Sequence, residues 1–163
     1  MPDTIRVVMA GYAVAKSPDL LETQALGSCV GIVIYDEEAG IAGMAHAMLP
    51  DFDEAREVSK GTPSKFVNSA IELLVKELVK LGGKKARFRA KLAGGANMFP
   101  DIVSTKSMAI GERNIISAHD TLKSRGITIT GEETGGHIGR TIVFDTKKNT
   151  LLIKAVVGNN KVI

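Results

Sequence analysis

Apolar residues recur at two different periods along the chain, and the longer period predicts two helices. Residues 62–83, TPSKFVNSAIELLVKELVKLGG, place apolar side chains on one helical face. Thr62 is expected to cap the start, Pro63 suits the first turn, and Gly82–Gly83 end the helix. A second helix is predicted over residues 107–125. The apolar face of the first helix comprises Val67, Ala70, Ile71, Leu74, Val75, Leu78 and Leu81.

The shorter period predicts β-strands. Residues 30–36 and 41–49 are apolar runs joined by a short connector that contains Gly40, a pattern that favours a hairpin. The segment 86–99 begins as an alternating strand, with one face formed by Phe88, Ala90 and Leu92 and the other, expected to be solvated, by Arg87, Arg89 and Lys91. Further strands are expected within residues 5–15, 19–26, 127–133, 140–146 and 151–157.

These elements together favour an α+β fold. Two long helices stand among about eight strands, many of them joined by hairpin-like turns. A strand–helix–strand alternation does not run through the whole chain, so a doubly wound parallel sheet is disfavoured. The length of 163 residues suits a single domain over residues 1–163, with no internal repeat or linker.

Composition and charge argue against nucleic-acid binding by base stacking and against insertion into a membrane. Aromatic residues make up 4% of the chain and tryptophan is absent, which gives little support to nucleic-acid binding by base stacking. The net charge of +3 allows an acidic partner without requiring one. No apolar run approaches the roughly 18 residues of a membrane span, and the N-terminus lacks the layout of a signal peptide. We therefore expect a cytoplasmic protein without membrane insertion, in which a lone cysteine stays reduced.

Neither a metal nor a cofactor is expected. The chain has no CxxC or HxxxH pair, and the acidic segment DFDE at 51–54 lacks the remaining ligands of a calcium loop. The glycine-rich segment 135–139 lacks the Lys–Ser/Thr ending of a phosphate-binding loop, so a plain turn is the better interpretation.

Cys29, the only cysteine, and His46 are the candidate pair for nucleophilic catalysis. The alternatives are a buried small hydrophobe for Cys29 and an imidazole hydrogen-bonded inside a sheet for His46. The thiol, however, follows Gly27 and Ser28, where the chain must turn and free backbone N–H groups can stabilise an anion. His46 lies on the second arm of the predicted hairpin, within reach of the first. Together the two residues meet the thiol-plus-base requirement.

A catalytic imidazole needs a third group that fixes its orientation and tautomer. No Asp or Glu lies within the strand arms beside this pair, because the nearby acidic residues cluster at 36–38. Thr23 is one candidate, through its hydroxyl or its carbonyl, although spacing alone does not single it out.

Longer motifs resemble the CheD-type chemoreceptor glutamine deamidases over residues 5–157. The combination is specific: T-x5-C, a His seventeen residues after the Cys, and AGGA[NS]MF. His137, within TGGHIGR, departs from the family pattern, which commonly has Asn there. The motifs are YAVAKSPDLLETQALGSCVGIVIYD, GIAGMAHAMLPD, KLAGGANMF, IGERN and EETGGHIGRTIVFDTKKNTLLIK.

This resemblance implies a concrete activity and fold. The family hydrolyses side-chain amides of glutamines in methyl-accepting chemotaxis receptors to glutamate and ammonia, and members also act on glutamyl methyl esters. Its catalytic Cys, His and Thr fall on Cys29, His46 and Thr23. Independently of the resemblance, the turn before the thiol makes the backbone N–H groups of Ser28 and Gly27 candidates for oxyanion support. Its fold is a three-layer sandwich, with two β layers and a layer of two long helices, similar to bacterial toxin deamidases.

The resemblance also implies two protein partners, the cytoplasmic helices of the receptors and a CheC-type phosphatase of the response regulator. The basic face of Arg87, Arg89 and Lys91 is a candidate for steering toward acidic receptor helices, or simply a solvated strand face. The apolar segment Phe99–Pro100 is a candidate docking site for the phosphatase, or ordinary core.

Two other functions fit the same residues. A different thiol hydrolase, such as a peptidase or a transglutaminase-like enzyme, would use the same Cys–His pair at an acyl carbon. A non-catalytic chemotaxis adaptor would retain its effect without the thiol.

Overall fold

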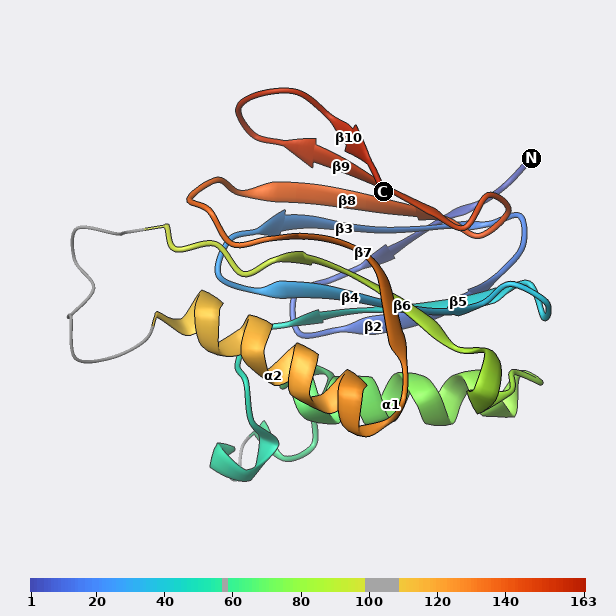
Figure 1. Cartoon of the computed structure of the whole chain (residues 1–163), viewed down its shortest axis with the longest axis horizontal. Helices are drawn as coiled ribbons and strands as arrows, with labels where there is room; N and C mark the ends of the chain where they lie inside the picture. Colours follow the sequence, from blue (N-terminus) through green and yellow to red (C-terminus); the bar gives the residue numbers. More distant parts are fainter. Residues whose placement is uncertain (57–58, 99–108) are drawn as a thin grey trace.

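Two five-stranded sheets and two helices make up the computed structural model, which describes residues 1–56, 59–98 and 109–163 (Figure 1). One sheet has the order β1-β3-β8-β9-β10 and the other has the order β2-β5-β4-β6-β7. The strands are β1 (Thr4–Val7), β2 (Tyr12–Lys16), β3 (Leu20–Leu26), β4 (Val30–Asp36), β5 (Ile41–Ala47), β6 (Arg89–Gly94), β7 (Thr128–Thr134), β8 (Arg140–Asp145), β9 (Thr150–Ala155) and β10 (Lys161–Val162). The mixed α+β class predicted from the sequence is confirmed.

The β2-β5-β4-β6-β7 sheet, called the central sheet below, is covered on both faces. Helices α1 (Val67–Lys80) and α2 (Ile110–Ser124) pack on one face, and the other sheet covers the opposite face (Figure 1). All seven residues of β4 and all seven of β5 are therefore buried. The two strands pair antiparallel from Asp36↔Ile41 to Val30↔Ala47, so the predicted hairpin is confirmed.

The start of helix α1 differs from the prediction, although its apolar face is confirmed. Pro63–Lys65 form a 3-10 turn, the Thr62 side chain makes no capping bond, and the α-helix begins at Val67. The Lys65 carbonyl accepts hydrogen bonds from Met48 N at 2.7 Å and Leu49 N at 3.1 Å. These tertiary bonds hold the 3-10 turn beside the end of β5, so the α-helix begins only at Val67.

Two parallel pairings were not predicted from the turn pattern. β1 pairs with β3, and β6 pairs with β7 across the crossover that contains α2. Parallel pairs leave no local turn signal in the sequence, because their connections are long. The β1–β3 pairing matters for the site, since it aligns Val7 with Thr23.

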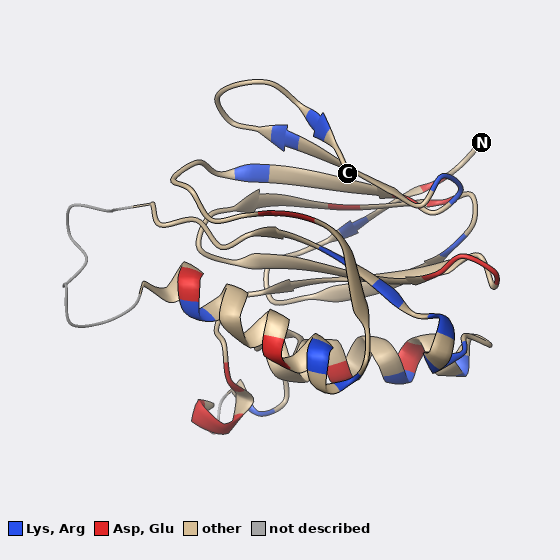
Figure 2. Ribbon diagram, viewed as in Figure 1, with Lys and Arg blue, Asp and Glu red and all other residues tan. Residues whose placement is uncertain are grey.

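The predicted basic face of Arg87, Arg89 and Lys91 is solvated at Arg89, which is exposed, but not at Lys91, which corrects that part of the sequence interpretation. Arg87 forms ion pairs with Asp36 at 2.9 Å and Glu38 at 3.3 Å. Lys91 is only 6% exposed, and its Nζ lies 5.8 Å from the Tyr35 ring centroid. Alternation placed Lys91 on the correct face, but the second sheet covers that face. Figure 2 shows Lys and Arg spread over both helices and several strands, interleaved with Asp and Glu.

Asp36 anchors the turn end of the hairpin, and its removal should destabilise the fold. This fully buried carboxylate accepts bonds from Arg87 Nε, Lys84 N and Ala39 N. Burial alone would raise its pKa, but these donors outweigh burial and hold the pKa below its ordinary value. We expect Asp36→Asn to lower the free energy of unfolding by about 2 kcal/mol at pH 7, measured by urea titration.

The pH dependence of that loss has a defined sign. A depressed native pKa contributes stability above the unfolded pKa of about 3.9 and loses it as the pH falls through the native value. The gap between wild type and Asp36→Asn should therefore shrink below about pH 4. Glu38→Gln is the control, because the side chain of Glu38 is 74% exposed and pairs with the same Arg87. An equal loss in both variants would contradict this account.

Candidate active site

A hydrogen bond between the two sheets joins Thr23 of β3 to His46 of β5. Thr23 Oγ1 lies 2.7 Å from His46 Nδ1, and both side chains are buried. The same hydroxyl donates to the Val7 carbonyl at 2.7 Å. A hydroxyl has one proton and a carbonyl can only accept, so the proton toward the ring must come from Nδ1. Neutral His46 is therefore the Nδ1–H tautomer, which leaves Nε2 as an acceptor.

The other ring nitrogen of His46 is available as a base. Its Nε2 is buried and has no hydrogen-bond partner among the residues that the structure describes. Burial lowers the pKa of His46, so the ring is neutral at pH 7. A buried polar atom without a partner costs free energy, so the bare Nε2 needs an explanation, and a role as a base is one.

Cys29 lies on the same face of the hairpin as His46. Gly31 stands opposite His46 in the β4–β5 register, and Cys29 precedes Gly31 by two residues. The period of two puts the Cys29 and His46 side chains on the same face, the one that packs against the other sheet. Cys29 packs in the core between the sheets and is 9% exposed. Burial raises the pKa of the thiol, against a smaller lowering by its own backbone N–H.

Within the part of the chain that the structure describes, the turn Gly27–Cys29 is bound through its backbone carbonyls and not through the N–H groups of Gly27 and Ser28. Every carbonyl of the turn accepts a hydrogen bond, whereas no described residue accepts from the backbone N–H of Gly27 or Ser28. This arrangement leaves N–H groups free beside the thiol, as an oxyanion hole requires. The Gly27 carbonyl accepts from Ala96 N at 2.9 Å, and the Ser28 carbonyl accepts from Asn114 Nδ2 at 2.9 Å. The Cys29 carbonyl accepts from Gly95 N at 2.8 Å.

A glycine allows the close approach behind Cys29. Gly94 has φ +102°, and a Cβ there would lie 2.3 Å from the Cys29 carbonyl oxygen. Arg140, which is 7% exposed, holds this loop by donating to the carbonyls of Gly94 at 3.0 Å and Gly135 at 2.6 Å. His137 lies outside the Cys–His pair, with Nδ1 2.8 Å from the Asn97 carbonyl.

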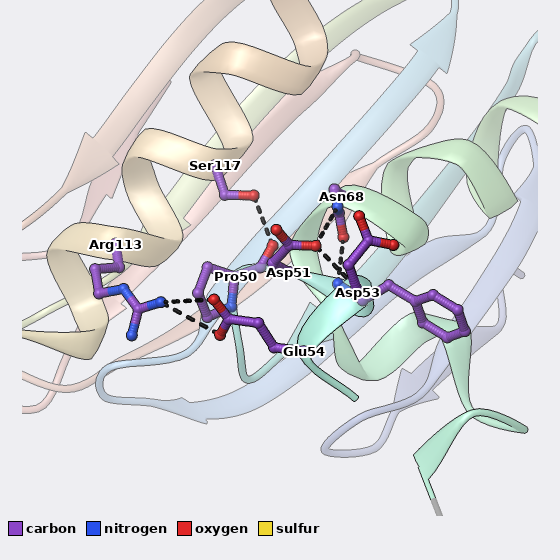
Figure 3. A network of polar contacts seen from close by, with 8 residues as sticks. Pro50, Asp51, Asp53, Glu54, Asn68, Arg113 and Ser117 are labelled. Carbon is purple, nitrogen blue, oxygen red and sulfur yellow. Dashed lines mark hydrogen bonds and ion pairs between the residues drawn. The ribbon is translucent and has the colours of Figure 1, made fainter. Parts of the chain in front are cut away.

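Acidic residues of the 51–54 segment serve structural contacts. Asp51 accepts from the Asn68 side chain at 3.1 Å, and Glu54 pairs with Arg113 at 3.4 Å (Figure 3). Within the described ranges no group of three or more His, Cys, Asp or Glu side chains could hold a metal ion. None of the described helices is both long and apolar enough to span a bilayer.

Asn114, Gly94 and Gly95 were not predicted as parts of the site, although all three lie in motifs of the family resemblance. The sequence offered no signal for their roles, because their contacts join residues from distant elements. The pairing of Thr23 with His46 was only one candidate among the residues and came from the resemblance.

The Cys29–His46 pair makes this a candidate thiol-hydrolase site, and comparison with known proteins identifies the family. Residues 48–155 match the family model described as CheD chemotactic sensory transduction. The probable chemoreceptor glutamine deamidase CheD 1 of Methanosarcina acetivorans is 44% identical, covering 99% of this chain and 98% of its own. The probable chemoreceptor glutamine deamidase CheD of Pyrococcus abyssi is 43% identical, and the match covers 97% of this chain and 95% of that protein. The chain therefore belongs to the CheD family.

The chain is also similar to a third CheD protein and to one solved structure. The probable chemoreceptor glutamine deamidase CheD of Caldanaerobacter subterraneus subsp. tengcongensis is 45% identical over 93% of both chains. The crystal structure of the hypothetical protein YfiH from Bacillus licheniformis overlaps 76% of this chain and 49% of its own, with 17% identity and a TM-score of 0.45. The second likeness is too weak for the two sites to be compared.

Thr23→Val keeps the shape of the side chain and removes the acceptor for Nδ1–H. The imidazole would then lose its fixed tautomer, and the thiol would lose a directed base. We expect the rate of Cys29 alkylation by iodoacetamide at pH 7 to fall about tenfold. Thr23→Ser retains the hydroxyl and should stay within about twofold of wild type. Alkylation of the Val variant at the wild-type rate would refute the orienting role.

Proposed function

We propose that this protein is a chemoreceptor glutamine deamidase, which hydrolyses glutamine side-chain amides in receptor helices to glutamate and ammonia. The observation that carries the proposal is the Val7–Thr23–His46 hydrogen-bond chain, which leaves Nε2 bare on the face of the only cysteine. The names of nearly full-length relatives support the same reaction.

In the proposed mechanism, His46 Nε2 takes the Cys29 proton as sulfur attacks the amide carbon of the substrate. Backbone N–H groups of Ser28 and Gly27 would hold the oxyanion, a contribution of roughly 3–4 kcal/mol per donor in other enzymes. The imidazolium then protonates the leaving nitrogen, and ammonia departs from a thioester. Water activated by the same Nε2 hydrolyses the thioester to glutamate and restores the thiol.

An apolar rim supports a helical protein as the substrate. Val8 and Met9 are exposed in the β1–β2 loop, which hydrogen-bonds to the backbone of His46. Met98 is also exposed and lies beside Gly27. Exposed apolar side chains beside the His46 backbone and beside Gly27 suit one face of a receptor helix, whose glutamine would enter between them. The receptor's helices lie in the cytoplasm, and we propose that the protein acts there.

A CheC-type phosphatase is proposed as a second partner, on the family resemblance alone. The segment Phe99–Pro100, considered above as its docking site, lies outside the described residues. The layered arrangement of two sheets and one pair of helices supports the three-layer sandwich that the resemblance implies, and with it the proposed likeness to bacterial toxin deamidases.

The products of the reaction separate this function from its alternatives. Wild type, Cys29→Ala and Cys29→Ser would be incubated with a folded cytoplasmic fragment of a cognate receptor. We expect wild type alone to convert Gln to Glu, with the Ser variant slower by roughly 10³-fold or more. Ammonia release and peptide mass spectrometry would follow the conversion.

Each other outcome points elsewhere. Cleavage of the fragment would indicate a peptidase, and amide exchange with an added amine would indicate a transglutaminase-like enzyme. Binding without any conversion would favour the adaptor. Substantial activity of Cys29→Ser would contradict the thiolate mechanism.

The pH profile of the deamidation tests the resting protonation state. Burial lowers the pKa of His46 and raises the pKa of Cys29, so the neutral pair persists across neutral pH. Since neutral His46 is the base, kcat/KM should rise with a midpoint below about pH 6.5 and stay level past about pH 8.5. An acid limb centred above pH 7 would contradict this assignment.

A further inference from the structure

Asn114 of helix α2 bonds both to the Gly27–Cys29 turn and to the residue that follows strand β5. Its side chain is fully buried, and Nδ2 donates to the Ser28 carbonyl at 2.9 Å and to the Met48 carbonyl at 3.0 Å. Carbonyls can only accept, so both contacts must come from the amide nitrogen, and the orientation of the amide is fixed. Ser28 precedes Cys29, and Met48 follows His46 by two residues.

The amide bridges a gap in the backbone ladder. The last β4–β5 pair is Val30↔Ala47, so pairing stops one residue short of Cys29. Beyond it the two chains part, and Met48 N donates to Lys65 instead. Asn114 lies between the parted chains and bonds to one carbonyl of each. A side chain thus replaces the missing ladder bonds at the point where the thiol and the imidazole must meet.

We propose that Asn114 is a positioning residue, which fixes the separation between the Cys29 thiol and His46 Nε2 that proton transfer requires. The inference rests on the proposed deamidase function for its reaction, but the coupling of thiol and imidazole can be measured without a receptor. Small displacements of reacting groups are costly, so a clamp at this point controls the rate.

A feature of the amide itself argues against a role in stability alone. Asn114 Oδ1 is buried and has no hydrogen-bond partner among the residues that the structure describes. The unpaired oxygen costs free energy that an apolar residue would avoid. Only a side chain with an N–H donor group, however, can bond to both the Ser28 and the Met48 carbonyls. The amide therefore serves the geometry of the two carbonyls.

The same helix offers a matched control. Ser117 Oγ donates to the Pro50 carbonyl at 2.7 Å, on the segment that follows β5 (Figure 3). This bond also anchors α2 to that segment, yet it reaches no atom of the Gly27–Cys29 turn. Ser117→Ala should therefore loosen the helix without disturbing the thiol.

The test compares Asn114→Asp, Asn114→Ala and Ser117→Ala with wild type. Asp keeps the shape of the side chain but as a carboxylate has no donor, and Ala removes the amide. We expect both Asn114 variants to lose about tenfold or more in Cys29 alkylation by iodoacetamide at pH 7. The pH at which alkylation is half-maximal should shift from below about pH 6.5, set by His46, to above about pH 8.5, where an unassisted thiol ionises.

In receptor deamidation kcat should fall about tenfold, with KM within about threefold. Ser117→Ala should match wild type in alkylation rate, in the pH profile of alkylation and in receptor deamidation.

Circular dichroism and thermal melting establish which variants are folded. A folded Asn114 variant with the wild-type alkylation profile would overturn the proposal. Unfolding of both variants would also overturn it, because Asn114 would then be a structural residue. If wild type fails to release ammonia from the receptor fragment while the alkylation profiles shift as expected, the deamidase proposal fails and the positioning role stands.

Discussion

The site depends on one hydroxyl, that of Thr23, held between a carbonyl and an imidazole. Because the Val7 carbonyl can only accept, the hydroxyl must accept from His46 Nδ1, and the opposite nitrogen is left bare. An Asp in the same place would fix the tautomer too, but it would favour the charged ring. A neutral orienter suits a resting pair in which both the thiol and the imidazole are uncharged. Burial shifts both pKa values in the directions that such a pair requires.

This contact requires two sheets to meet face to face, since Thr23 and His46 belong to different ones. The β4–β5 hairpin supplies a rigid platform because both of its faces are covered. Beyond the end of the hairpin, the carbonyls of the Gly27–Cys29 turn are all bound by donors behind it. This support leaves the N–H groups of Gly27 and Ser28 without acceptors among the described residues, and the Asn114 amide extends the same support to the end of β5.

The sequence predicted those parts of the fold that depend on local period. The buried face of α1 and the β4–β5 hairpin follow directly from the spacing of apolar residues. The sequence interpretation was wrong for Lys91, because alternation gives the face of a strand but not what covers it. The start of α1 was wrong as well, since tertiary bonds to the Lys65 carbonyl override the capping signal at Thr62.

For the site, chemistry identified Cys29 and His46 as candidates, and their roles remain predictions. Thr23 could be singled out only through the family resemblance, because its contact with His46 joins strands of two different sheets, whose packing the sequence does not reveal. Asn114 could not be found from sequence, since its two acceptors lie 86 and 66 residues away.

Nitrogen-15 NMR of the His46 ring at pH 7 tests the central claim most directly. The hydrogen-bond chain requires a neutral imidazole with its proton on Nδ1 and a bare Nε2, both in wild type and in Cys29→Ala. Signals of that tautomer would support a base directed at the thiol. A proton on Nε2, or an imidazolium at this pH, would contradict the arrangement on which the mechanism rests.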